Sequence, residues 1–169
     1  MIGDYINYFR DLCSHSASLI ASGSDPAFEV SSIEEAFGDF NHNIPISGMY
    51  FRLILPTINT EYAGDDRYID NAEGGFEIGK MYMAGDSASK ISALQDSEDV
   101  CRVFIARMMR DSRLGVSGGF IARGFNGVNV IHLRPMLATG DTSYAGMLVL
   151  FPMQISSEYC SSNPDWTDL

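Results

Sequence analysis

The sequence predicts a single α+β domain in which two main helices flank an antiparallel or mixed sheet of four to five strands. Three observations support this class: an uninterrupted apolar run at 145–155, a hairpin pattern just before it, and two segments with helical spacing of apolar residues. Along the chain the order is helix, strand, strand, long helix, strand, strand, strand. A chain of 169 residues is long enough for one core, so one domain at 1–155 is expected.

The run at 145–155 is the strongest strand signal. Residues 147–151 leave no hydrophilic face, so this strand must be covered on both sides. Upstream, segment 119–133 reads as a hairpin in which strands at 120–123 and 128–133 flank Asn126-Gly127, a pair suited to a tight primed turn.

The first third of the chain begins with a helix. Ile6, Phe9, Cys13, Ala17 and Ile20 recur at three-to-four spacing. A turn cluster at 21–26 then precedes a short strand at 28–30. The capping-box pattern at 32–35 predicts one or two turns of helix that include Phe37 and Phe40.

Two strands are predicted in the middle, at 49–58 and 76–84, and Pro56 is expected to stop the first. Segment 59–75 between them is a long acidic loop. Connections longer than about 12 residues are uncommon unless they bind something or are disordered. We therefore expect the loop to be an arm that reaches a partner, with these candidate interface acids: Asp65, Asp66, Asp70 and Glu73.

The second helix is capped by Asp96 or Ser97 and stopped by Gly115, which gives about 18 residues. Its arginines lie toward its negative end. They are Arg102, Arg107, Arg110 and Arg113. Two hypotheses stay open for them: pairing with the chain's own acids, or an intersubunit role in which the acidic loop of one copy meets the basic helix of the next.

Charge and cysteine content exclude several classes. The net charge of −11 argues against a general nucleic-acid binder, although residues 102–134 hold six arginines and a single acid. No apolar run is long enough to span a membrane, and the first residues lack a secretory pattern. The three cysteines, Cys13, Cys101 and Cys160, are odd in number and scattered, so we expect buried thiols and no disulfide framework.

No motif indicates catalysis. The histidines lack partners at metal-ligand spacing, Cys101 lies on an apolar stripe, and the acidic loop does not match a calcium loop. We therefore predict no catalytic residue, no cofactor and no metal. The alternative is a small-ligand-binding domain or enzyme whose pocket includes Tyr82, His132 and Arg134.

The polar segment 156–169 follows the last strand and contains Trp166, the only tryptophan. One interpretation is a frayed terminus. The other is a C-terminal arm that Trp166 anchors on a neighbouring subunit.

The chain resembles tail terminator and head-to-tail connector proteins of tailed bacteriophages, particularly those of Bacteroidetes phages. The resemblance covers nearly the whole chain and is carried by an opening helix with 8–13 (YFRDLC), the long helix, and the final pair 130–135 (VIHLRP) and 144–151 (YAGMLVLF). It implies an α+β fold with two helices and no catalytic residues.

The resemblance also implies a structural virion protein, made in the host cytoplasm, at the tail or neck. Copies would form a homo-oligomeric ring, a hexamer or dodecamer, that joins the tail tube to the head-side connector. DNA would pass through the channel without specific binding, and no membrane is involved. A tube or baseplate component of a contractile injection machine is the other virion-like role considered.

Overall fold

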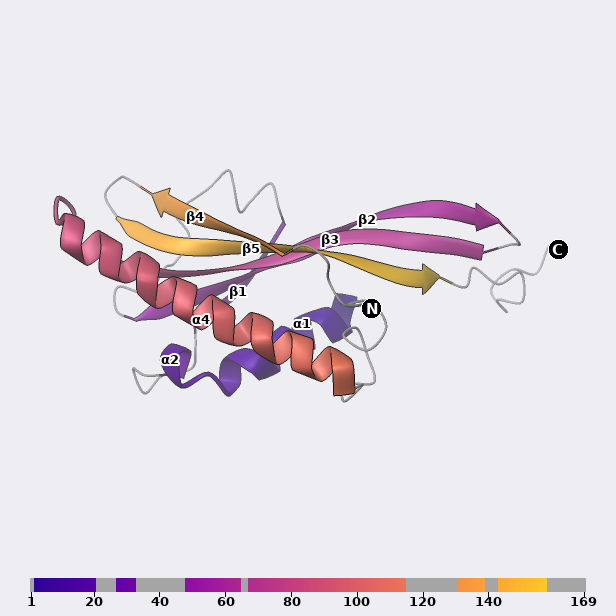
Figure 1. Ribbon diagram of the computed structural model, residues 1–169, viewed down its shortest axis with the longest axis horizontal. Coiled ribbons are helices and arrows are strands. Elements are labelled where there is room, and N and C mark those ends of the chain that lie inside the picture. Colours follow the sequence, from indigo (N-terminus) through magenta and orange to yellow (C-terminus); the bar gives the residue numbers. More distant parts are fainter. Residues whose placement is uncertain are drawn as a thin grey trace.

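The computed structural model describes residues 2–20, 27–32, 48–64, 67–114, 131–138 and 143–157. The elements are α1 (Ile2–Ser14), α2 (Ala17–Ile20), β1 (Ala27–Ser31), β2 (Met49–Gly64), β3 (Arg67–Met81), α4 (Ser87–Leu114), β4 (His132–Ala138) and β5 (Tyr144–Ser157). They form a five-stranded mixed sheet with two main helices, so the predicted α+β class is confirmed (Figure 1).

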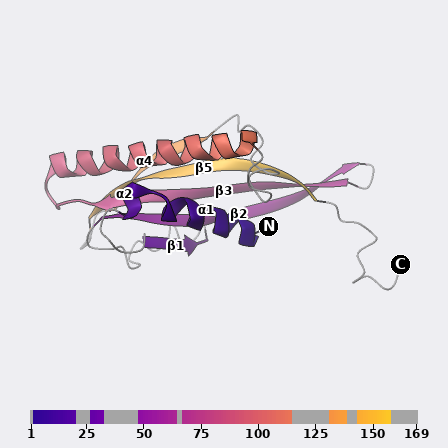
Figure 2. The same cartoon turned by 90° about the horizontal axis from the view of Figure 1, so that it is seen from below.

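The strand order across the sheet is β1-β2-β3-β5-β4. β1 runs parallel to β2, and the other neighbouring pairs are antiparallel. Both α1 and α4 lie on one face of this sheet, which is clear from the two ribbon views (Figures 1 and 2). The sheet therefore has a helix-covered face and an opposite face.

The core between helices and sheet is aromatic. Phe9 of α1 lies 5.6 Å from Phe76 and 6.0 Å from Phe51, measured between ring centroids. Phe104 of α4 stacks on Phe51 at 5.3 Å. Aromatic rings bury large apolar areas, so this cluster fixes both helices on the sheet.

β5 is buried on both faces, as its sequence predicted. Val149 belongs to the core under the helices, whereas Leu148 and Leu150 cluster with Ile54 on the opposite face. This division follows from the alternation of side chains along a strand. The continuous apolar pattern therefore identified a strand that is covered on both sides.

The prediction of an acidic loop at 59–75 is wrong. β2 and β3 pair from Met49↔Lys80 out to Gly64↔Arg67, so almost all of this segment is strand. Pro56 does not end β2 because it falls in a register shift between Ile54 and Thr57, where no ladder partner is required of it. β3 also starts earlier than predicted and ends at Met81 instead of Ala84.

The strands project beyond the helices at one end of the molecule (Figures 1 and 2). We call this part the ribbon: residues 57–64 of β2, 67–73 of β3 and 152–157 of β5. β1 pairs with β2 only at 50–54, and β4 pairs with β5 only at 144–150. In the described part of the chain, both outer strands of the ribbon thus have an unpaired edge.

The long helix starts earlier than predicted and spans 28 residues from Ser87. Oδ1 of Asp86 accepts hydrogen bonds from the backbone N–H of Ala88 at 2.9 Å and of Ser89 at 3.2 Å, which makes Asp86 the N-cap. Asp96 and Ser97 lie inside the helix. The predicted end holds, since the helix stops at Leu114, just before Gly115.

Three further predictions can be compared with the structure. The strand at 28–30 is confirmed as β1. The opening helix is interrupted, because α1 ends at Ser14 and α2 follows from Ala17. β4 overlaps the predicted strand 128–133 only at its start. Outside the described residues lie the turn at 21–26, the helix at 33–40, the strand at 120–123 and the turn at 126–127.

Candidate functional site

The candidate interface arginines all lie on α4, and three of them have partners in the same chain. Arg102 Nη2 lies 2.5 Å from Glu98 Oε1, and Arg107 Nε lies 2.8 Å from Asp111 Oδ2. Arg110 Nε is 3.7 Å from Asp111 Oδ1. Arg113 is exposed in the last turn and forms no ion pair with the residues that the structure describes.

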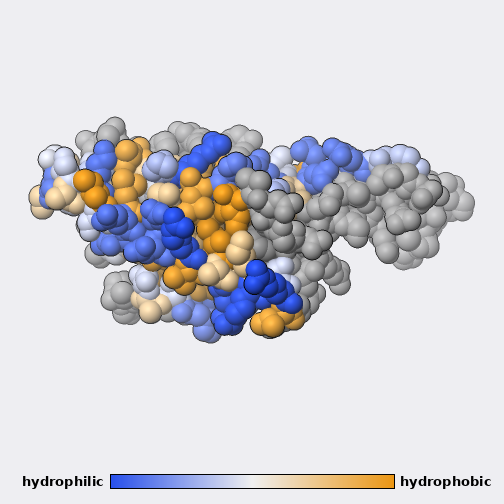
Figure 3. Space-filling model, in the orientation of Figure 1, coloured by the Kyte–Doolittle hydropathy of each residue, from blue (hydrophilic) through white to orange (hydrophobic). Residues whose placement is uncertain are grey.

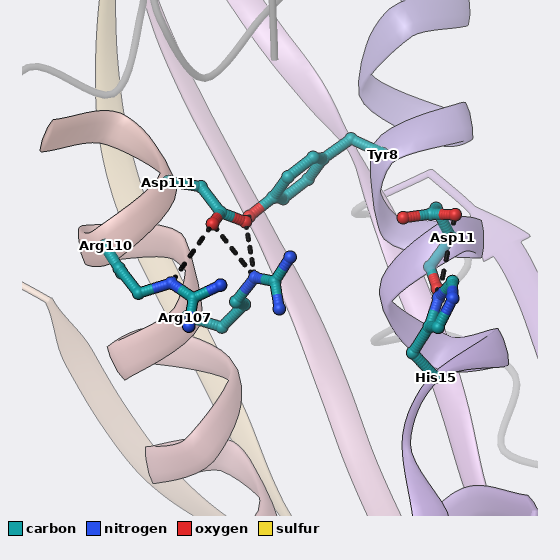
Figure 4. A network of polar contacts seen from close by, with 6 residues as sticks. All are labelled: Tyr8, Asp11, His15, Arg107, Arg110 and Asp111. Atoms are coloured by element: carbon teal, nitrogen blue, oxygen red, sulfur yellow. Dashed lines mark hydrogen bonds and ion pairs between the residues drawn. The ribbon is translucent and has the colours of Figure 1, made fainter. Parts of the chain in front are cut away.

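The carboxylate of Asp111 also connects α4 to α1 (Figure 4). Tyr8 donates a hydrogen bond from its hydroxyl to Asp111 Oδ2 at 3.2 Å, and Asp111 is buried. Burial and the neighbouring carboxylate both raise the pKa of Tyr8, so its hydroxyl keeps the proton that it donates. Two of the candidate arginines therefore pair with the carboxylate that joins the two helices.

Two of the candidate acids lie at described positions of the ribbon. Asp70 occupies β3 opposite Thr60, and exposed Glu73 lies opposite Thr57. The ion pairs of the described residues include none between the ribbon and α4. Outside the described residues lie Asp65, Asp66 and Trp166, together with the rest of the predicted arm from 158 onward.

A row of three charges, two of them buried, crosses the sheet face opposite the helices, and sequence reasoning missed it. Arg52 of β2 pairs in register with Glu29 of β1 and with Glu77 of β3. Arg52 Nε lies 3.2 Å from Glu29 Oε2, and Arg52 Nη1 lies 3.4 Å from Glu77 Oε2. Arg52 is 1% exposed and Glu77 is fully buried. We call these three residues the charge row.

Two tyrosines complete this site. Tyr50 donates a hydrogen bond to Glu77 Oε1, and its ring meets that of Tyr144 edge to face at 5.5 Å. The Arg52 guanidinium lies 5.8 Å from the centroid of the Tyr50 ring. Gly79 makes room for this ring, because a Cβ at that position would come within 2.6 Å of three Tyr50 atoms.

Burial acts on the pKa values of Glu77 and Arg52 in the charge row. It raises the pKa of Glu77, and the hydrogen bond from Tyr50 and the charge of Arg52 oppose this only in part. Burial alone would lower the pKa of Arg52, but the carboxylates of Glu77 and Glu29 outweigh it and raise that pKa. Arg52 Nη2 is buried and has no hydrogen-bond partner in the described part of the chain.

The sequence contained a signal for this row. Arg52 is the one charge in the apolar run 49–56, and Glu77 stands among apolar residues in the next strand. Charged residues are almost never fully buried unless they are paired. Two opposite charges in neighbouring central strands therefore indicate a buried pair, once the register of the strands is known.

The residues of the alternative pocket do not converge. His132 and Arg134 are exposed on the edge strand β4, and Leu148 stands between Arg134 and Glu77 in the same cross-strand row. Tyr82 is half-buried just after β3, and its backbone N–H donates to Ser143 O at 3.1 Å.

Two cysteines are core residues, as predicted. Cys13 and Cys101 are free and buried, and burial raises the pKa of the Cys101 thiol to about 12. Within the described ranges, no group of three or more His, Cys, Asp or Glu side chains is placed to hold a metal ion. None of the helices in those ranges is both long and apolar enough to cross a membrane.

No protein-family model matches the chain. None of the curated proteins matches its sequence.

Proposed function

We propose that this chain is a structural protein of the tail or neck of a tailed phage. In this proposal it is a tail terminator that assembles as a homo-oligomeric ring, a hexamer or dodecamer, and joins the tail tube to the head-side connector. Its mechanism is binding, and its site of action is the virion. The place in the virion comes from the sequence resemblance, and the assembly role is supported by the ribbon.

The ribbon is the observation that carries the proposal. Its outer strands present backbone donors and acceptors along unpaired edges, in the described part of the chain, and its tip lies away from both helices (Figure 1). Exposed strand edges are templates for pairing with other chains, and folded proteins normally cover or protect them. A preformed projecting ribbon therefore suits a protein whose arm is covered after assembly.

The charge of the chain fits the same role. With 22 acidic and 11 basic residues, a ring of these chains would repel the phosphates of DNA overall and let it pass without specific binding. A tube or baseplate component would use the ribbon in a similar way, and its position in the particle distinguishes it from a terminator.

Cryo-electron microscopy of intact particles tests the proposal, together with mass photometry of the purified chain at several concentrations. We expect one ring of copies at the head-proximal end of the tail tube. Copies along the tube or in the baseplate would favour the other virion role. Absence of the chain from purified particles would contradict both.

A second candidate function is small-ligand binding at the charge row. Arg52 Nη2 offers a buried donor that the described residues leave unpaired, and a carboxylate or phosphate could accept from it. Thermal-shift measurements with a panel of small anions test this idea. A strictly monomeric chain that one anion stabilises, with the effect lost in Arg52→Met, would favour it over the ring.

A further inference from the structure

We propose that two copies of this chain pair edge to edge through β2 of the ribbon, as antiparallel strands related by a two-fold axis at Thr60. The contact joins the five-stranded sheets of the two copies into one. This inference goes beyond the proposed function, because it uses only the ribbon and needs neither a ring nor a virion. Figure 3 shows the described ribbon as a hydrophilic surface, so backbone pairing at a strand edge is the kind of contact that suits it.

The outer edge of β2 is open along the ribbon. β1 pairs with β2 only up to Ser31↔Ile54, whereas β2 pairs with β3 out to Gly64↔Arg67. Along this stretch, odd-numbered side chains of β2 point to one face and even-numbered ones to the other. Both faces are accessible, because residues 57 and 59–62 are exposed. A further strand can therefore be added here without displacing any strand of the described sheet.

The other edges of the described sheet carry features that oppose strand addition. β1 is only five residues long. The edge strand β4 has Arg134-Pro135 near its centre, and β5 enters the ribbon with Pro152. Proline, charged side chains and short strands are the usual protection of a sheet edge. Segment 57–62 of β2 contains no proline, and Glu61 is its single charge, so this edge is the least protected of them.

The length of this edge fits a second copy of the same segment. In an antiparallel pair with its axis at Thr60, Gly64 at the end of one strand lies opposite Pro56 of the other. Each hairpin end then stops just short of β1 of the other copy, since β1 ends with Ser31 beside Ile54. The free stretch between β1 and the hairpin end is thus filled by the same stretch of the second copy.

The neighbouring registers are less favourable, because a two-fold axis fixes which residues face each other. An axis at Asn59 would push each hairpin end onto the position that Ser31 of β1 occupies. An axis at Glu61 would place two Glu61 carboxylates directly opposite each other, and like charges in such a pair are destabilising. The axis at Thr60 avoids both problems.

The cross-strand pairs in this register are favourable on both faces. Ile58 lies opposite Tyr62 of the second copy, and the Tyr62 side chain is 62% exposed in the single chain. A pair of an aromatic and a β-branched side chain stabilises a sheet. On the other face Asn59 lies opposite Glu61, where the amide can donate to the carboxylate. The axis creates each pair twice, so the contact is self-complementary and closes with two copies.

Two substitutions at Asn59 test the contact with opposite signs. Asn59→Glu would face Glu61 of the second copy with a like charge, whereas Asn59→Lys would face it with an opposite charge. Within the chain, Asn59 lies opposite the uncharged Asn71. We expect Asn59→Glu to weaken dimerisation about tenfold and Asn59→Lys to strengthen it by about the same factor, measured by sedimentation velocity at low salt.

Matched controls place the same charges one strand further from the contact. Asn71→Glu and Asn71→Lys lie on the same face as Asn59 but on β3. Each should change the dimerisation constant less than about threefold at physiological salt, because charges separated by more than about 8 Å in water are largely screened there. Circular dichroism confirms that every variant is folded.

Cysteine cross-linking reads the register directly, even when the dimer is weak. Opposite residues of a strand pair have Cβ atoms about 4.5–5.5 Å apart, close to the separation in a disulfide. In a Cys160→Ser background, Thr60→Cys should form a disulfide-linked dimer under mild oxidation faster than Asn59→Cys or Glu61→Cys alone. An equimolar mixture of these last two variants should form a linked heterodimer. The other two native thiols are buried.

The outcomes separate this inference from the proposed function. A wild-type chain that stays monomeric while Thr60→Cys fails to cross-link would overturn the strand pairing, and so would a dimer that both Asn59 variants leave unchanged. Either result leaves the virion role standing. Absence of the chain from purified particles, together with the expected response of the Asn59 and Thr60 variants, would contradict the virion role and support the strand pairing.

Discussion

Tyr5 is the residue that joins the body of the domain to the ribbon. It is fully buried, and its hydroxyl lies 3.0 Å from Ile54 O and 3.1 Å from Gly75 O, and it accepts from Gly75 N–H at 3.0 Å. These backbone groups flank the register shift between β2 and β3. A Cβ at position 74 would lie 2.8 Å from the same hydroxyl, so Gly74 keeps the space that Tyr5 occupies.

We expect Tyr5→Phe to lower the free energy of unfolding by about 1–3 kcal/mol, because the substitution leaves buried backbone groups without their partner. Urea denaturation of the purified chain measures this difference. Tyr62→Phe is the control, since the Tyr62 side chain is 62% exposed and a change there should stay within about 0.5 kcal/mol. Equal losses in the two variants would contradict the role assigned to Tyr5.

Glu77 makes stability depend on pH in a defined direction. Burial raises its pKa in the folded protein above the ordinary value of 4.5, so the folded state binds this proton more tightly than the unfolded state. The contribution of this group to stability is complete below that ordinary value and is lost as the pH rises through the folded-state pKa.

Comparison with Glu77→Gln isolates the effect, because glutamine does not titrate. Urea denaturation across a pH series should show the stability of the wild type falling relative to Glu77→Gln as the pH rises above about 4.5. A difference that grows in favour of the wild type with rising pH would instead mean that Arg52 and Tyr50 outweigh burial.

At the scale of elements, α4 shows why a helix can be recognised while its start is misplaced. Apolar residues from Val100 to Met108 recur at helical spacing and predicted the element, and Gly115 predicted its end. Asp96 and Ser97 are good cap residues by type, but both are used differently: Asp96 Oδ2 accepts from Lys80 Nζ at 2.8 Å, and Ser97 Oγ donates to Ala93 O at 2.7 Å. Several residues suited to a cap are present, and the folded chain uses Asp86.

We expect Asp86→Ala to lower the free energy of unfolding by about 0.5–2 kcal/mol, because it removes the acceptor for two N–H groups in the first turn of α4. Thermal or urea unfolding followed at 222 nm measures it. Asp99→Ala, at an exposed position inside the same helix, should change stability by about 0.5 kcal/mol or less. A larger effect at Asp99 than at Asp86 would contradict the capping assignment.

At the scale of the whole molecule, the body of the domain is well packed, whereas the backbone of the ribbon is less protected. β3 at 75–79 is paired on both sides and lies beneath the helices, whereas β2 at 57–62 is paired on one side only in the described chain. Local opening is easiest where few buried contacts hold the backbone.

Hydrogen–deuterium exchange followed by mass spectrometry should therefore show faster exchange in peptides covering 57–62 than in those covering 75–79 for the unassembled chain. In assembled particles the 57–62 peptides should become protected, because a neighbouring copy covers them. Protection of 57–62 that is the same before and after assembly would contradict the placement of the ribbon in an interface.

The sequence by itself determined the fold class, the doubly covered strand β5 and the existence of both main helices, because hydrophobic periodicity is a local property that survives in the folded chain. It also showed that the acids and the arginines of the candidate interface lie in different segments of the chain. The tertiary structure alone decided that 59–75 is a strand pair, that Asp86 caps α4, and that Arg52, Glu77 and Glu29 share one row. Strand register brings together residues far apart in sequence, and no local pattern encodes which strand becomes the neighbour.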